Sequence, residues 1–115
     1  MKSKYKNIKV TRTVNNEIVT FDSKREAKRY DELWLLAVHG KIEELTLQPK
    51  YELLPKFKHE GVTHRPVTYV ADFRYIQDGE TIVEDVKGML TDVYRIKKKL
   101  FLKRYGKDIT FKEIF

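Results

Sequence analysis

The residues of this chain best suited to chemistry are two aspartates and a lysine, Asp72, Asp85 and Lys87. Asp72 ends the apolar run 67–71, whereas Asp85 and Lys87 lie two positions apart in a later strand-like run. Side chains alternate between the faces of a strand, so Asp85 and Lys87 are expected on one face. The turn signal at residues 77–80 predicts a hairpin that brings Asp72 alongside Asp85. Such a carboxylate pair can bind Mg²⁺ with several waters retained, and Lys87 could hold an attacking water.

Each member of this group also has a purely structural interpretation. Asp72 could form a salt bridge to Arg74 or Lys87, and Lys87 could be a solvated strand end. We favour metal ligation because Asp85 on the neighbouring strand would add like-charge repulsion that a cation relieves. Glu84 is a competing carboxylate, but strand alternation places it on the face opposite Lys87.

A glutamate near the start of the first predicted helix is a further candidate. Ser23 and Glu26 have the spacing of a capping box, which predicts a helix to about His39 with Gly40 as its C-terminal stop. Apolar residues recur at helical spacing along it: Tyr30, Leu33, Trp34, Ala37 and Val38. Glu26 lies on the same stripe, so its carboxylate can either cap the helix or reach the edge of the acidic site.

The other elements are mainly strands. Extended segments are predicted at residues 8–14, 17–21, 42–48, 50–54, 67–76, 81–87 and 108–115. The first two form a hairpin with a turn at Asn15 and Asn16, preceded by a mobile basic tail. Pro49 lacks a backbone donor and therefore predicts an edge or a bend between the third and fourth segments.

Basic side chains gather in two segments that are expected to contact phosphates. One is a helix that begins at Thr91 or Asp92 and ends at about Tyr105. Its predicted core-facing residues are Val93, Ile96 and Leu100, and its basic residues on another side are Arg95, Lys98, Lys99 and Lys103. The second segment is a basic loop or hairpin tip over residues 55–66, with Lys56, Lys58 and Arg65. A solvated charged face is the alternative for the helix.

Length and composition narrow the class of protein. The chain has 115 residues, enough for one domain with a single core but not for a separate specificity domain. It carries 24 Lys and Arg against 17 Asp and Glu, a net charge of +7 that favours a polyanionic partner over a merely soluble basic protein. The absence of cysteine excludes disulfides and thiolate metal sites. Neither a membrane span nor a signal peptide is apparent, which predicts an intracellular protein without a membrane partner.

The pattern of Asp72 followed by Asp85-x-Lys87 resembles the signature of the PD-(D/E)XK nuclease superfamily. The predicted order of elements is similar to the helix, three strands, helix and strand of its restriction-endonuclease-like core. More closely, the segments 21–27, 47–53, 69–73 and 85–88 resemble a small phage-encoded nuclease family thought akin to phage Holliday-junction-resolving endonucleases. The resemblance implies one α/β (α+β) domain over 1–115, with a basic tail and hairpin at 1–20 and a core at 21–115. That core would have a central mixed sheet flanked by helices.

The resemblance also implies an activity and a set of ligands. Asp72, Asp85, the Val86 backbone carbonyl and Glu26 would bind Mg²⁺, for which Mn²⁺ would substitute, and Gln48 would lie close to the site. Lys87 would position or deprotonate water. The expected substrate is DNA, with a branched form favoured, cut by a homodimer in the bacterial host cytoplasm if the gene is phage-encoded. Cleavage of flaps, nicks or duplex remains open, and a non-catalytic nucleic-acid-binding module is the rival class.

Overall fold

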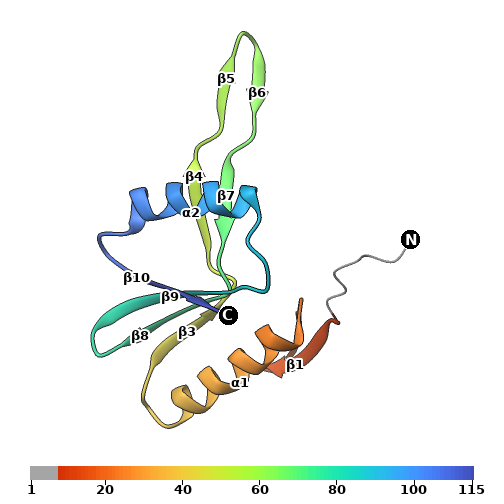
Figure 1. Cartoon of the computed structure of the whole chain (residues 1–115), viewed down its shortest axis with the longest axis vertical. Coiled ribbons are helices and arrows are strands. Elements are labelled where there is room, and N and C mark those ends of the chain that lie inside the picture. Colours follow the sequence, from red (N-terminus) through yellow and green to blue (C-terminus); the bar gives the residue numbers. More distant parts are fainter. Residues whose placement is uncertain (1–7) are drawn as a thin grey trace. The chain divides into compact units, whose positions relative to one another are not determined.

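The computed structural model describes residues 8–115, and these divide into two compact units with a boundary between Lys41 and Ile42 (Figure 1). The basic tail predicted at the N-terminus falls on residues 1–7 and lies outside the described residues. Neither of the described helices is long and apolar enough to cross a membrane. The two units are considered separately below.

The first unit consists of a hairpin and a helix. Strands β1 (Val10–Val14) and β2 (Glu17–Phe21) pair antiparallel. Asn15 and Asn16 connect them with φ of 50° and 66°, a left-handed turn that asparagine tolerates well. Helix α1 (Lys24–Val38) begins where the backbone nitrogen of Glu26 donates to Ser23 Oγ over 3.1 Å. The predicted hairpin, the predicted helix and its Ser23 cap are therefore confirmed.

The second unit contains a mixed four-stranded sheet in the order β10-β9-β8-β3. Its strands are β3 (Glu43–Leu47), β8 (Phe73–Gln77), β9 (Glu80–Val86) and β10 (Thr110–Ile114). β10 runs parallel to β9, and the other neighbours are antiparallel. Asp78 and Gly79, with φ of 51° and 79°, form the predicted turn between β8 and β9. An α+β fold with a mixed sheet and two helices is thus confirmed.

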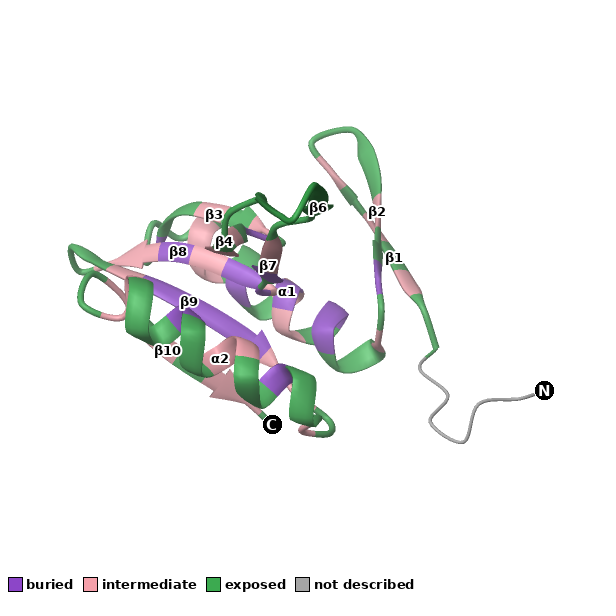
Figure 2. Cartoon of the chain, turned by 90° about the horizontal axis from the view of Figure 1, so that it is seen from above, coloured by how far each residue is buried: buried purple, intermediate pink, exposed green. Residues whose placement is uncertain are grey.

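Helix α2 (Asp92–Tyr105) connects the parallel strands β9 and β10 and lies over them (Figure 2). Thr91 caps it, since the backbone nitrogen of Tyr94 donates to Thr91 Oγ1. The buried core on this side comprises Tyr69, Ala71, Val83, Tyr94 and Phe101.

The predicted core-facing stripe of α2 is wrong. Val93, Ile96 and Leu100 are 63%, 60% and 44% exposed. The helix buries Tyr94 and Phe101 instead, two aromatic residues at i and i+7 on a neighbouring stripe. Large aromatic rings remove more apolar area from water than aliphatic side chains do, so the aromatic stripe is the one that packs against Tyr51, Tyr69 and Phe111.

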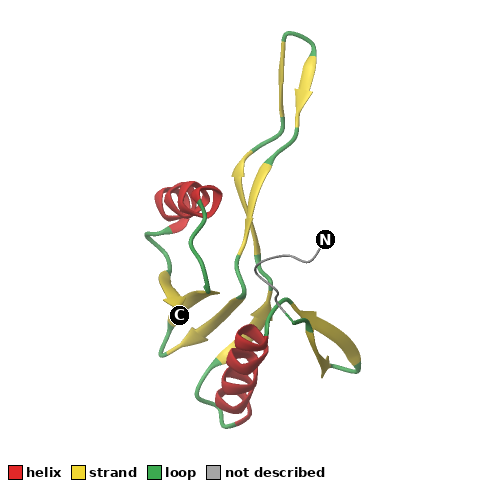
Figure 3. Ribbon diagram, turned by 45° about the vertical axis from the view of Figure 1, so that its right-hand side comes forward, coloured by secondary structure: helices red, strands yellow, loops and turns green. Residues whose placement is uncertain are grey.

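A long two-stranded ribbon is inserted between β3 and β8 (Figure 3). Its base pairs β4 (Lys50–Leu54) with β7 (Val67–Val70), and its tip pairs β5 (Phe57–His59) with β6 (Val62–His64). The prediction of one strand across 67–76 is therefore wrong, because the chain bends at Ala71 and Asp72 between β7 and β8.

The bend at Ala71 and Asp72 lies next to the bend predicted at Pro49. The backbone nitrogen of Gln48 donates to the Asp72 carbonyl over 2.9 Å, and that of Ala71 donates to the Pro49 carbonyl over 3.0 Å. Gln48 adopts a left-handed φ of 51°, and Pro49 cannot donate to a ladder. The two segments of the ribbon therefore leave the sheet at the same place, and these backbone hydrogen bonds hold Asp72 there.

Candidate active site

Asp72 lies where the ribbon joins the sheet and faces the end of β9. The register pairs Phe73 with Glu84, so the next pair along the ladder is Asp72 with Asp85. The Asp72 backbone nitrogen donates to the Glu84 carbonyl over 3.0 Å, and Asp72 Oδ2 accepts from the backbone nitrogen of Val86 over 2.6 Å. The hairpin thus brings the first aspartate to the strand that carries the second.

Asp85 and Lys87 point to one face of β9, as strand alternation predicts. Lys87 Nζ is 3.0 Å from Asp85 Oδ1, and the Asp85 side chain is only 3% exposed. Tyr69 donates its hydroxyl hydrogen to Asp85 Oδ2. Lys87 Nζ also lies 3.9 Å from the centre of the Tyr94 ring. A buried carboxylate is costly unless it is paired, and here a cation and a hydroxyl donor compensate its charge.

The two tyrosines beside the acids are held protonated. Burial raises the pKa of Tyr69 far above its usual value, and the hydrogen bond to Asp85 raises it further. Burial likewise raises the pKa of Tyr94, helped by its hydrogen bond to Glu113 and by the charge of Asp85. Both hydroxyls therefore act as hydrogen-bond donors to carboxylates at neutral pH and are unsuited to act as general bases.

A second carboxylate network adjoins Lys87 and was not predicted. Glu113 on β10 accepts from the Tyr94 hydroxyl over 2.7 Å and from Lys98 Nζ over 2.6 Å. Burial alone would raise the pKa of Glu113, but the hydrogen bonds from Lys98 and Tyr94 and the charge of Lys87 lower it overall. Lys98 is thus held by an ion pair instead of lying on a free basic face, which corrects its predicted placement.

Replacing Glu113 by Gln should lower the free energy of unfolding by roughly 1–2 kcal/mol at pH 7. Because the folded-state pKa of Glu113 is lowered, its stabilisation is present above the unfolded-state pKa and is lost as pH falls through the folded-state pKa. Urea unfolding from neutral to acidic pH should show the wild type and Glu113→Gln converging in acid. Glu80→Gln, at the exposed first residue of β9, is the matched control. A difference that does not change with pH would contradict this assignment.

Glu84 is the other acid on β9, and it points away from Asp85. Its side chain is fully buried and accepts a hydrogen bond from the Tyr75 hydroxyl. Strand alternation correctly separated Glu84 from Lys87. The strand-like segment 81–87 therefore carries two buried acids on opposite faces.

Two further residues, Gln48 and Glu26, were predicted at or near the site. The Gln48 backbone contacts Asp72, although the Gln48 side chain is exposed. Glu26 belongs to the first unit, where its backbone nitrogen takes part in the Ser23 cap and its side chain is buried. The hydrogen bond from the Glu26 backbone to Ser23 is thus observed, whereas ligation by the Glu26 carboxylate remains a prediction.

The donor set of this site fits a hard divalent cation. Among the described residues no group of three or more His, Cys, Asp or Glu side chains is placed to hold a metal. Mg²⁺, however, is commonly bound by one or two carboxylates with waters completing its shell. A carboxylate oxygen has two lone pairs, so an oxygen that accepts a hydrogen bond can also coordinate a cation.

The predicted phosphate-contacting residues are mostly exposed. Arg95 lies 3.3 Å from Asp92 on the surface of α2. The following side chains are exposed: Lys56, Lys58, Arg65, Arg95, Lys99 and Lys103. Lys98 differs from these because of its ion pair with Glu113.

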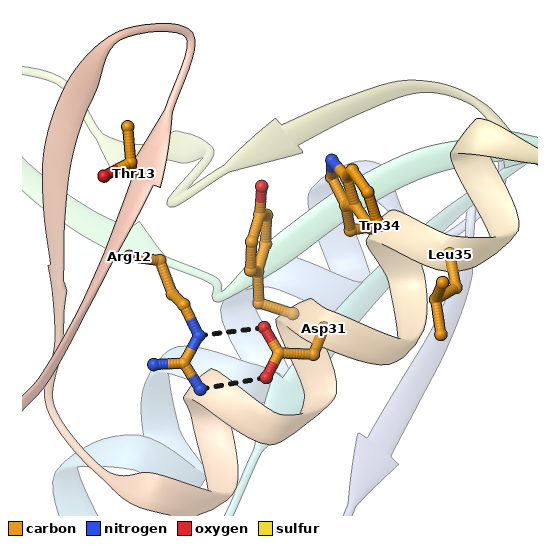
Figure 4. A pocket seen from close by; sticks show the side chains of 6 residues that line it. Arg12, Thr13, Asp31, Trp34 and Leu35 are labelled. Carbon is orange, nitrogen blue, oxygen red and sulfur yellow. Dashed lines mark hydrogen bonds and ion pairs between the residues drawn. The ribbon is translucent and has the colours of Figure 1, made fainter.

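A separate pocket of about 400 Å³ lies within the first unit, between β1 and α1 (Figure 4). Trp34, which helical spacing placed in the core, is 50% exposed and lines this pocket. Arg12 Nε and Nη2 each donate to Asp31 over 2.9 Å, which joins the hairpin to the helix and lowers the pKa of Asp31. The pair is partly exposed, so its contribution to stability is small.

Comparison with known proteins identifies the family. No curated protein matches the chain. A family model described as "Protein of unknown function (DUF1064)" matches residues 2–114. This match spans nearly the whole of both units, so the chain belongs to the DUF1064 family.

Proposed function

We propose that this protein is a Mg²⁺-dependent DNA endonuclease of the PD-(D/E)XK type, with Asp72, Asp85 and Lys87 at its centre. The observation that carries the proposal is the placement of the two aspartates opposite each other at the end of the β8–β9 hairpin, with Lys87 Nζ 3.0 Å from Asp85. Two hard oxygen donors and an ammonium in one patch can support metal-dependent hydrolysis of a phosphodiester.

The order of elements supports a restriction-endonuclease-like core. Helix α1 precedes β3, β8 and β9, which are followed by α2 and β10. This is the helix, three strands, helix and strand of the resemblance, with β10 parallel to β9 and with the ribbon β4–β7 inserted between β3 and β8. Asp72 immediately precedes β8 and Asp85 lies on β9, an order similar to that of the acids in the superfamily pattern.

Each residue would have a distinct role. Asp72, Asp85 and the Val86 carbonyl would bind the cation. When bound, Mg²⁺ would neutralise charge on the scissile phosphate and lower the pKa of water near it. Lys87 would orient that water, and Tyr69 would fix the Asp85 carboxylate by donating a hydrogen bond.

The proposed substrate is branched DNA, such as a four-way junction. The net charge of +7 favours a polyanion as the partner. Cutting a four-way junction productively takes two symmetric nicks, which a homodimer supplies from one short chain.

The test is cleavage of labelled four-way, flap and linear DNA by the purified protein in Mg²⁺ or Mn²⁺. We expect metal-dependent nicking and a saturable Mn²⁺ site in calorimetry, both strongly weakened in Asp72→Asn. The Asn carboxamide can still accept from the Val86 nitrogen, so this variant should fold. Absence of cleavage on every substrate in both metals would contradict the proposal.

A non-catalytic DNA-binding module is the second candidate, because both oxygens of Asp85 are already paired within the protein. Such a set of contacts is also what a structural ion pair would make. In that case divalent ions would only screen DNA binding, with no saturable site, and Asp72→Asn would leave the metal dependence unchanged.

A further inference from the structure

The tip of the ribbon, residues 56–65, is built without a core. All residues of β5 and β6 are exposed on both faces. The ribbon extends well beyond α2 and the sheet of its own unit (Figures 1 and 3). An isolated two-stranded hairpin is at best marginally stable in water, so this extension contributes little to folding. A binding role explains its presence better than a structural one.

The two faces of the tip carry different chemistry. The register pairs Phe57 with His64, Lys58 with Thr63, and His59 with Val62. Because side chains alternate, Phe57 and His64 share one face and Lys58 points to the other. The Phe57 and His64 rings stack with centroids 4.7 Å apart and planes 11° from parallel. Phe57 is nevertheless 43% exposed, so a ligand can reach the stacked pair from solvent.

The charge of the tip favours a polyanion. Lys56, Lys58 and Arg65 are positive, Glu60 is the single acid among residues 56–65, and the formal net charge of this segment is therefore +2 with neutral histidines. A two-stranded ribbon is narrow enough to enter the major groove of DNA. Phosphate binding alone would need only the basic side chains, however, and it leaves the aromatic pair unexplained.

We infer that the ribbon tip recognises the branch point of DNA, with the Phe57–His64 ring pair stacking on an exposed base and Lys58 contacting a phosphate. Continuous duplex hides its base faces in the helical stack, whereas a branch point interrupts the stack and exposes them. Aromatic side chains stack on any base, so this surface would select shape without reading sequence. The inference deepens the proposed nuclease function and rests on it for the identity of the ligand as DNA.

The experiment measures binding of the full chain in EDTA, so that cleavage plays no part. The probes are a four-way junction with 2-aminopurine at the branch point and a linear duplex of the same sequence. Wild-type protein should quench the 2-aminopurine fluorescence. Phe57→Ala should weaken junction binding roughly tenfold, leave duplex binding and the salt slope unchanged, and abolish this quenching. Phe57→Trp should retain both affinity and quenching.

Two further variants separate stacking from charge and from general apolarity. Lys58→Ala should weaken binding to both DNAs and reduce the slope of log affinity against log salt by about one unit. Phe115→Ala removes another exposed phenylalanine of the same unit, at 69% exposure, and should change nothing. Circular dichroism of each variant reports retention of the fold.

Equal effects of Phe57→Ala on junction and duplex, or no effect on either, would overturn the inference. If the protein cleaves DNA but Phe57→Ala leaves junction binding unchanged, only the stacking surface is refuted. A protein that never cleaves but loses junction binding in Phe57→Ala would refute the proposed nuclease and support the stacking surface. The failures of the two proposals are therefore distinguishable.

Discussion

Asp85→Asn should reduce the rate of DNA cleavage about 10²-fold or more. The substitution keeps the shape of the side chain and can still accept the hydrogen bond from Tyr69, but it removes a negative charge from the proposed cation site. Asp85 is 2% exposed, so its charge acts in a poorly solvated environment where electrostatic effects are strong. Single-turnover cleavage of a labelled junction at saturating Mg²⁺ measures the effect.

DNA binding should move in the opposite direction. Removing a carboxylate near the scissile phosphate lowers the electrostatic repulsion, so Asp85→Asn should bind DNA in EDTA as tightly as the wild type or more tightly. A gel-shift or anisotropy titration beside the cleavage assay separates these effects. A general loss of structure would weaken binding and cleavage together.

Asp78→Asn is the matched control for this substitution. It makes the same chemical change in the same β8–β9 hairpin, at an exposed turn position with φ of 51° that asparagine adopts readily. Its cleavage rate should equal that of the wild type. If Asp85→Asn cleaves DNA at the wild-type rate, the assignment of Asp85 to the active site is wrong.

The local parts of the structure could be predicted because each depends on a few neighbouring residues. The turn at Asp78 and Gly79 follows from residues that tolerate positive φ, and helix starts at Ser23 and Thr91 follow from side chains that accept backbone hydrogen bonds. The shared face of Asp85 and Lys87 follows from the period of two in a strand.

The parts that could not be predicted depend on contacts between distant segments. Nothing near Tyr69 in the sequence indicates that its hydroxyl binds Asp85, and the pairing of Lys98 with Glu113 joins α2 to a strand 15 residues away. The bend at Ala71 and Asp72 has no glycine or proline of its own and is matched by Pro49 on the other strand.

Helix α2 shows why periodicity alone was insufficient. Two neighbouring stripes have apolar residues at helical spacing, one with Val93 and Ile96 and one with Tyr94 and Phe101. Only the second stripe both packs in the core and makes polar contacts, because Tyr94 contacts Glu113 and Lys87. Aromatic residues with a polar end were the available signal for the buried face.

This arrangement holds Lys87 between Asp85 and the Tyr94 ring, and it makes the lysine testable apart from the acids. Lys87→Ala should reduce the cleavage rate by about 10²–10⁴-fold, the usual range for a group that moves or orients a proton. Lys87→Arg should remain impaired, since a guanidinium differs in shape and cannot give up its proton. Lys112→Ala, an exposed lysine on β10, should cleave normally.

Metal binding by Lys87→Ala decides between catalysis and structure. Removing the ammonium leaves Asp85 without its cation in a buried position, which should lower the melting temperature of the variant in EDTA. If the aspartates bind a divalent cation, Mn²⁺ supplies the missing positive charge and also meets less repulsion than in the wild type. Calorimetry should then give an affinity equal to or higher than that of the wild type, and Mn²⁺ should raise the melting temperature more in Lys87→Ala. A purely structural ion pair would give the same low melting temperature with no recovery in Mn²⁺, because no second cation would occupy the place of the lysine.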